Sequence, residues 1–157
     1  MFARSLLFAL LVLALDQISK EVLIAHLQNR SGPVHVTSFF NLVMVWNTGV
    51  SFGLFQDMQY GQFFFAGLSG IIVLFLLKWL AGVEDTGTAF ALALIIGGAI
   101  GNVIDRFRFG AVADFFDFYI GDLHWPAFNI ADAAVFTGAM ILCMVVLFGH
   151  KGEGNNP

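Results

Sequence analysis

The chain has 157 residues, of which 59% are hydrophobic and 11% charged, and its formal net charge is −4. A chain of this length cannot bury so much apolar surface in a core of its own, so the composition excludes an ordinary soluble domain and predicts an integral membrane protein. The acidic balance argues against a nucleic-acid-binding protein, and the single cysteine, Cys143, excludes an intrachain disulfide.

Four apolar segments are long enough to cross a bilayer as helices, at about residues 2–25, 62–80, 88–109 and 130–148. The first begins like a signal peptide, with Arg4 before a leucine-rich run, but its apolar pattern continues beyond Asp16 and favours a retained helix. In the third segment, Gly97, Gly98 and Gly101 permit close helix packing. The segments predict one mainly helical membrane domain with both termini on the same side, which we place in the cytoplasm.

The stretches between these segments favour other structures. FFNLVMVW at 39–46 is rich in aromatic and β-branched residues and predicts a strand. SFGLFQDM at 51–58 is typical of a short interfacial helix, which would act as a lid. Residues 110–129 are too polar to cross and predict a small hairpin with its turn at Gly121–Asp122. The polar tail after Gly149 is expected to be mobile.

Ionisable side chains in apolar helices are costly to insert into a membrane, so each is expected to have a pairing partner or a functional role. Asp16 and Lys20 are four residues apart on one helical face, where they would either neutralise each other or contact a substrate. Asn102, Asp105 and Arg106 also share a face. They predict a polar network between helices, with two alternatives left open: Asn102 as a donor to a bound peptide, and Arg106 as a binder of phosphate or carboxylate.

The candidate catalytic pair is Asp114 and Asp132. Asp114 lies in the apolar stretch GAVADFF, and Asp132 follows Asn129 by three residues at the start of the last apolar segment. Asp132 could instead be a simple helix N-terminal acid with Asn129 as the cap. Both acids, however, lie at the same end of adjacent predicted helices, where two facing carboxylates can share one proton and activate water. Asp117 and Asp122 are rival acids in the predicted hairpin.

Five motifs in chain order resemble the bacterial lipoprotein signal peptidase (signal peptidase II) family of membrane aspartic endopeptidases: LDQISK (15–20), NTGVSFG (47–53), GGAIGNVIDR (97–106), VADFFDF (112–118) and PAFNIAD (126–132). The resemblance implies that Asp114 and Asp132 form the catalytic dyad. It also implies supporting or substrate-binding roles for the polar positions Asp16, Lys20, Asn47, Asn102, Asp105, Arg106 and Asn129.

The same resemblance implies four transmembrane helices, an extracytoplasmic β-cradle and a short interfacial helix. The implied substrate is a prolipoprotein with a diacylglyceryl-modified cysteine, cut immediately before that cysteine at the outer face of the bacterial inner membrane. Besides this substrate we expect only membrane lipids as partners, a monomer, and no nucleic acid, metal or cofactor.

Two other classes of protein remain as alternatives. In a small transporter or proton relay, the carboxylates would be spaced across the bilayer, whereas a peptidase gathers them near one face. In a membrane scaffold without enzymatic activity, the acids would be partners in a structural network.

Overall fold

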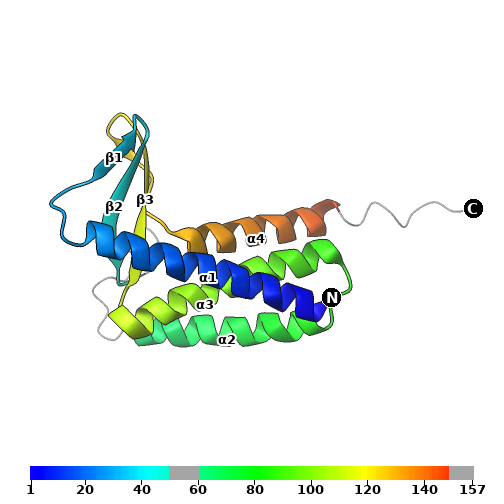
Figure 1. Ribbon diagram of the computed structural model, residues 1–157. Helices are drawn as coiled ribbons and strands as arrows, with labels where there is room; N and C mark the ends of the chain where they lie inside the picture. Colours follow the sequence, from blue (N-terminus) through cyan, green and yellow to red (C-terminus); the bar gives the residue numbers. More distant parts are fainter. Residues whose placement is uncertain (50–60, 149–157) are drawn as a thin grey trace, which may run out of the picture.

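The computed structural model describes residues 1–49 and 61–148 and consists of a helical bundle with a small sheet at one end (Figure 1). The described residues form four helices, which are α1 (Phe2–Leu27), α2 (Gly61–Ala81), α3 (Thr86–Phe109) and α4 (Ile130–Phe148). The prediction of a mainly helical chain with a small sheet is therefore confirmed. The predicted interfacial helix at 51–58 and the tail after Gly149 lie outside the described residues.

Within the described ranges, α2, α3 and α4 are the three helices long and apolar enough to cross a membrane. Helix α1 is 26 residues long, but it carries several charged side chains and is not one of these three. A fourth crossing, by α1, therefore stays a prediction.

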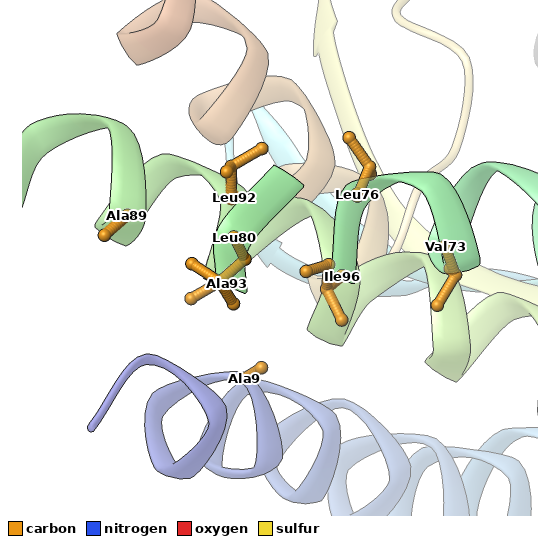
Figure 2. Close-up of a cluster of buried hydrophobic side chains, with 8 residues drawn as sticks. All are labelled: Ala9, Val73, Leu76, Leu80, Ala89, Leu92, Ala93 and Ile96. Atoms are coloured by element: carbon orange, nitrogen blue, oxygen red, sulfur yellow. The ribbon is translucent and has the colours of Figure 1, made fainter. Parts of the chain in front are cut away.

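Helix α3 lies at the centre of the bundle and packs against each of the other three helices. Figure 2 shows the buried cluster in which side chains of α1, α2 and α3 meet, made of Ala9, Val73, Leu76, Leu80, Ala89, Leu92, Ala93 and Ile96. Many large apolar side chains point outward instead, among them Leu74, Phe136 and Val146. A surface this apolar is stable only when lipid covers it.

The sheet consists of β1 (Val34–Thr37), β2 (Phe40–Asn47), β3 (Val112–Ile120) and β4 (Leu123–His124). The strands lie in the order β1-β2-β3-β4, and each is antiparallel to its neighbours. The predicted strand at 39–46 is thus β2, and the predicted hairpin within 110–129 is the pair β3 and β4. Gly121 lies in the turn between β3 and β4 with φ of 59°, a conformation that glycine adopts without strain.

The junction between α3 and β3 positions the first candidate acid. Helix α3 ends at Phe109 and is followed by the C-cap residue Gly110, whose φ of 73° is the left-handed conformation typical of this position. The chain then turns directly into β3, which carries Asp114 and pairs it with Val45 of β2. The end of the bundle and the start of the sheet therefore meet at Asp114.

Glycines in α3 allow its neighbours to approach closely. A Cβ atom at Gly97 would lie 2.5 Å from the carbonyl oxygen of Ala9 in α1, and one at Gly98 would collide with the carbonyl oxygen of Ala131 in α4. Real Cβ atoms do not make such contacts with backbone, so any larger residue separates the helices. This confirms the prediction of close packing at Gly97 and Gly98.

Replacing Gly98 by alanine should therefore lower the melting temperature of the purified protein, because overpacking costs about 1–3 kcal/mol. The matched control is Gly70→Ala in α2, where the added methyl would meet nothing within 4 Å. Alanine is the better helix former at both positions. A Gly98→Ala protein as stable as the Gly70→Ala protein would contradict the close packing of α3 on α4.

Candidate active site

Asp114 and Asp132 come from different elements and meet through one residue. Asp114 lies in β3 and is 2% exposed, and Asp132 lies in the first turn of α4. The side-chain amide of Asn129 donates to Asp114 Oδ1 at 2.7 Å, and the backbone N–H of Asn129 donates to Asp132 Oδ2 at 3.3 Å. The two acids that the sequence pairs are therefore neighbours in the fold.

Asn129 also caps α4. Its Oδ1 accepts a hydrogen bond from the backbone N–H of Asp132 at 2.9 Å, and the return bond to Asp132 Oδ2 completes a capping box. The two alternatives for Asp132 are thus compatible. The capping bonds fix the position of the Asp132 carboxylate, which is also close enough to Asp114 for its charge to act on that acid.

Three asparagine side chains present their NH₂ groups to this pair. Besides Asn129, Asn47 donates to Asp114 Oδ2 at 3.1 Å, and Asn102 donates to Asp132 Oδ1 at 2.7 Å. All four carboxylate oxygens of Asp114 and Asp132 thus accept a hydrogen bond from the surrounding protein.

The orientation of each amide follows from its other partner. The Oδ1 of Asn47 accepts from the backbone N–H of Gly49 at 3.1 Å, and the Oδ1 of Asn102 accepts from the ammonium of Lys20 at 3.1 Å. The Oδ1 of Asn129 accepts from the backbone, as described above. Since these partners can only donate, each NH₂ group must point toward a carboxylate.

A buried ionic cluster supports the same region. The Lys20 ammonium lies 2.9 Å from Asp16 Oδ2 and 2.9 Å from Asp105 Oδ2, and none of the three side chains is more than 2% exposed. The ion pair between Asp16 and Lys20 is present, with Asp105 as a second partner, and a contact of either residue with substrate stays a prediction. The predicted network between helices is also present.

The cluster reaches the two elements that carry the candidate acids. Asp16 Oδ1 accepts from the backbone N–H of Ala131 in α4 at 2.9 Å, and Asp105 Oδ2 accepts from the backbone N–H of Ala113 in β3 at 3.2 Å. Ala131 precedes Asp132, and Ala113 precedes Asp114. Asp16 therefore fixes the backbone beside Asp132, and Asp105 fixes the backbone beside Asp114.

Gln17 is a further member that the sequence reasoning missed. Its amide nitrogen donates to Asp105 Oδ1 at 3.1 Å and to the carbonyl oxygen of Gly101 at 3.3 Å. Its position inside the motif LDQISK was the available signal. A polar residue between Asp16 and Lys20 would need partners of its own in an apolar helix.

The side chain of Arg106, in the last turn of α3, reaches the residues that follow β2. Its Nη2 donates to the carbonyl oxygen of Gly49 at 3.1 Å, and its guanidinium lies 5.9 Å from the ring centroid of Phe65 in α2. Within residues 1–49 and 61–148, its buried Nε has no hydrogen-bond partner. These contacts place Arg106 in the polar network, and the phosphate or carboxylate alternative stays a prediction.

The rival acids of the hairpin have other surroundings. Asp117 accepts hydrogen bonds from His124 at 2.8 Å and from Asn41 at 3.0 Å, which link β2, β3 and the end of β4. Asp122 is exposed in the turn between β3 and β4. The described residues contain no cluster of three or more side chains that could hold a metal ion.

The electrostatic environment separates Asp114 from an ordinary carboxylic acid. Burial, and after it the negative charge of Asp132, raises the pKa of Asp114 to about 7. The hydrogen bonds from Asn47 and Asn129 and the charge of Lys20 act in the opposite direction. A carboxyl group that is half protonated near neutral pH can both donate and accept a proton during a reaction.

Comparisons with known proteins identify the family of the chain. The model of a family described as signal peptidase (SPase) II matches residues 8–148. A lipoprotein signal peptidase of Cupriavidus necator is 48% identical, covering 86% of this chain and 78% of the relative. One of Aeromonas hydrophila is 43% identical, covering 96% of this chain and 90% of the relative.

A solved structure described as a bacterial membrane enzyme superposes with a TM-score of 0.86 at 27% sequence identity, covering 99% of this chain and 94% of the solved one. Together with the family match over residues 8–148, this likeness extends the resemblance from single motifs to the whole fold. The chain therefore belongs to the signal peptidase II family and is a membrane aspartic endopeptidase of the kind that removes signal peptides from prolipoproteins.

Proposed function

We propose that this peptidase cleaves diacylglyceryl-modified prolipoproteins immediately before the lipidated cysteine, with Asp114 and Asp132 as its catalytic dyad. One observation carries the proposal. Two carboxylates from different elements are held together at the sheet end of an apolar helical bundle, and asparagine donors reach all four of their oxygens. The raised pKa of Asp114 supports a pair that carries one proton near neutral pH, as an aspartic peptidase needs.

In the proposed reaction, a water molecule held between the two carboxyl groups attacks the carbonyl carbon of the residue before the cysteine. Ionised Asp132 accepts a proton from this water, and protonated Asp114 donates its proton to the carbonyl oxygen. The resulting gem-diol intermediate collapses as protonated Asp132 gives its proton to the amide nitrogen, the C–N bond breaks, and a hydroxyl proton of the intermediate passes to Asp114, which restores the starting state of both acids. The N–H groups at the start of α4 and the amide of Asn102 stabilise the negative charge on Asp132.

We further propose that α1 is a fourth crossing, with both termini in the cytoplasm and the sheet at the outer face of the inner membrane. Helix α1 runs beside α3 along the bundle (Figure 1) and turns Leu7, Leu10 and Leu11 outward. Its 26 residues reach roughly 39 Å at 1.5 Å per residue, enough for the hydrocarbon core. The acyl chains of the substrate then stay in lipid while its peptide bond reaches the dyad.

The location of the buried acids favours a peptidase over a proton relay. Among the described residues, the buried carboxylates are Asp16, Asp105, Asp114 and Asp117. All four belong to the end of the bundle that joins the sheet, or to the sheet itself, as their contacts with β3 and α4 show. A relay would need acids spaced along the helices.

Asp114→Asn and Asp132→Asn should each reduce prolipoprotein cleavage by a factor of 10² or more while the protein stays folded, because each removes one partner of the proton transfer. The Asn129 cap remains, and an asparagine oxygen at position 132 can still accept from the backbone N–H of Asn129, so the second change leaves the start of α4 intact. The assay is a gel shift of lipidated substrate with purified enzyme. The exposed Asp122→Asn is the matched control and should retain full activity. Wild-type activity in either dyad variant would contradict the assignment.

Lys20→Met should strongly destabilise the protein, because it leaves Asp16 and Asp105 buried beside each other without their counter-charge. Breaking a buried ion pair in this way costs about 3–5 kcal/mol. The measurement is thermal unfolding in detergent, with Lys78→Met at the end of α2 as the control. An unchanged melting temperature for Lys20→Met would show that the cluster does not hold the fold together.

The pH dependence of turnover follows from the raised pKa of Asp114. A protonated Asp114 is required, and this proton is lost as the pH rises through about 7. This pKa belongs to the free enzyme, so we expect kcat/KM to fall by about tenfold per pH unit on the alkaline side. A kcat/KM that stays constant between pH 7 and pH 9 would contradict Asp114 as the proton donor.

A further inference from the structure

The end of the sheet farthest from the dyad exposes large apolar side chains. In the turn between β1 and β2, Phe39 is 54% exposed. Ile120 and Leu123, the pair that closes the turn between β3 and β4, are 84% and 80% exposed, and Trp125 just after that turn is 62% exposed. We call these four residues the sheet tip.

The sheet tip is one continuous surface, because both turns lie at the same end of the sheet. The backbone N–H of Tyr119 in β3 donates to the carbonyl oxygen of Phe39 at 3.0 Å, which joins the two turns. The backbone N–H of Trp125 donates to the carbonyl oxygen of Phe118 at 2.8 Å, which holds the chain after the turn against β3. Between residues 118 and 125 the sequence contains one carboxylate, that of Asp122.

The opposite end of the sheet packs against the C-terminal end of α3, where charged side chains are exposed on the bundle. Trp46 of β2 lies with its ring 5.2 Å from that of Phe109, the last residue of α3. Arg108, which directly precedes Phe109, forms an exposed ion pair with Glu21 of α1. Aromatic and charged residues together are typical of the depth of the lipid headgroups.

The strands run across the helix axes, and the sheet extends sideways beyond the bundle (Figure 1). A sheet that lies in this direction keeps its two ends at a similar depth in the membrane. The sheet tip is then beside the bundle at headgroup level, displaced laterally from the helices. In the proposed membrane orientation, apolar side chains at this position would meet lipid and not bulk water.

We propose that the sheet tip inserts into the interfacial region of the outer leaflet, as a second membrane contact beside the helical bundle. The proposal rests on the placement of the sheet at the membrane surface that the proposed function includes. Tryptophan with isoleucine, leucine and phenylalanine is the composition of side chains that partition into this region. The contact continues the lipid-facing surface of the helices.

The phospholipid surface fits the tip better than a second copy of the chain. A standard protein interface uses about 20–30 residues on each side, whereas the tip offers four large side chains on two short turns. Insertion into lipid needs no complementary partner surface. It needs only apolar side chains at the right depth, which the tip supplies.

The contact would fix the height and tilt of the active site. Ile120 and Asp114 lie on the same strand, six residues apart, so the tip is roughly 20 Å from the dyad along β3. A bundle of helices alone is free to tilt in the bilayer. A second contact far from the bundle axis restricts that tilt and holds the dyad at the depth where a lipidated cysteine presents its peptide bond.

The direct test uses the fluorescence of Trp125 to report whether the sheet tip contacts lipid. In a Trp46→Phe/Trp79→Phe protein, Trp125 is the only remaining tryptophan of the sequence. The protein is reconstituted into phosphatidylglycerol–phosphatidylethanolamine vesicles that contain lipids brominated near the headgroup or near the acyl-chain end. We expect strong quenching by the shallow bromine, weaker quenching by the deep one, and protection from aqueous iodide.

Quenching by iodide without quenching by either brominated lipid would overturn the proposal. Protection from both quenchers would also overturn it, because a protein partner or a second copy would then cover the tip. A protein that keeps only Trp79, on the outward-facing surface of α2, serves as the positive control for lipid quenching. This readout needs no catalysis, so it is independent of the dyad assignment.

The functional consequence is tested by Ile120→Asp/Leu123→Asp, with Asp122→Asn in the same turn as the control. We expect the double variant to process lipidated substrate in vesicles at least fivefold more slowly than the control. In detergent micelles, where no bilayer sets the height of the site, the two should agree within twofold. Equal rates in vesicles would remove the positioning role. A loss of rate in both settings would show damage to the sheet and not to membrane contact.

Discussion

The ammonium of Lys20, shared between Asp16 and Asp105, is the interaction on which the rest of the site depends. A lysine with 2% exposure inside an apolar bundle is stable only because both carboxylates and Asn102 satisfy its donors. The two carboxylates in turn hold the backbone next to each catalytic candidate. One buried cluster thus places a strand residue and a helix residue with the precision that proton transfer requires.

The asparagines fix the orientation of the two carboxylates, in addition to the position that the buried cluster gives them. Lys20 fixes the amide of Asn102, backbone N–H groups fix Asn47 and Asn129, and each then offers its NH₂ group to a carboxylate. Neutral donors suit the proposed mechanism, because a cation at the same place would favour the ionised form of both acids, whereas the mechanism needs one of them protonated. The raised pKa of Asp114 is consistent with this balance between burial and neutral hydrogen bonding.

Much of the fold and the site could be predicted from sequence, for physical reasons. Long apolar segments have few alternatives to helices, and a polar residue in such a segment needs a partner, which singled out Asp16, Lys20 and Asn102. The contacts made by backbone groups could not be predicted. That Asp16 accepts from Ala131 and Asp105 from Ala113 depends on how four distant segments pack, and no pattern in the sequence records it. The partners of Gln17 were missed for the same reason.

The central claim is that Asp114 and Asp132 act as one catalytic unit, and a double-mutant cycle measures this directly. Single-turnover rates of peptide release are compared for Asp114→Asn, Asp132→Asn and the double variant, with enzyme in excess over lipidated substrate. If the two carboxyl groups share one proton-transfer step, the double variant should be no slower than the slower single variant. Losses that multiply in the double variant would mean that the two residues act independently, and would contradict a dyad.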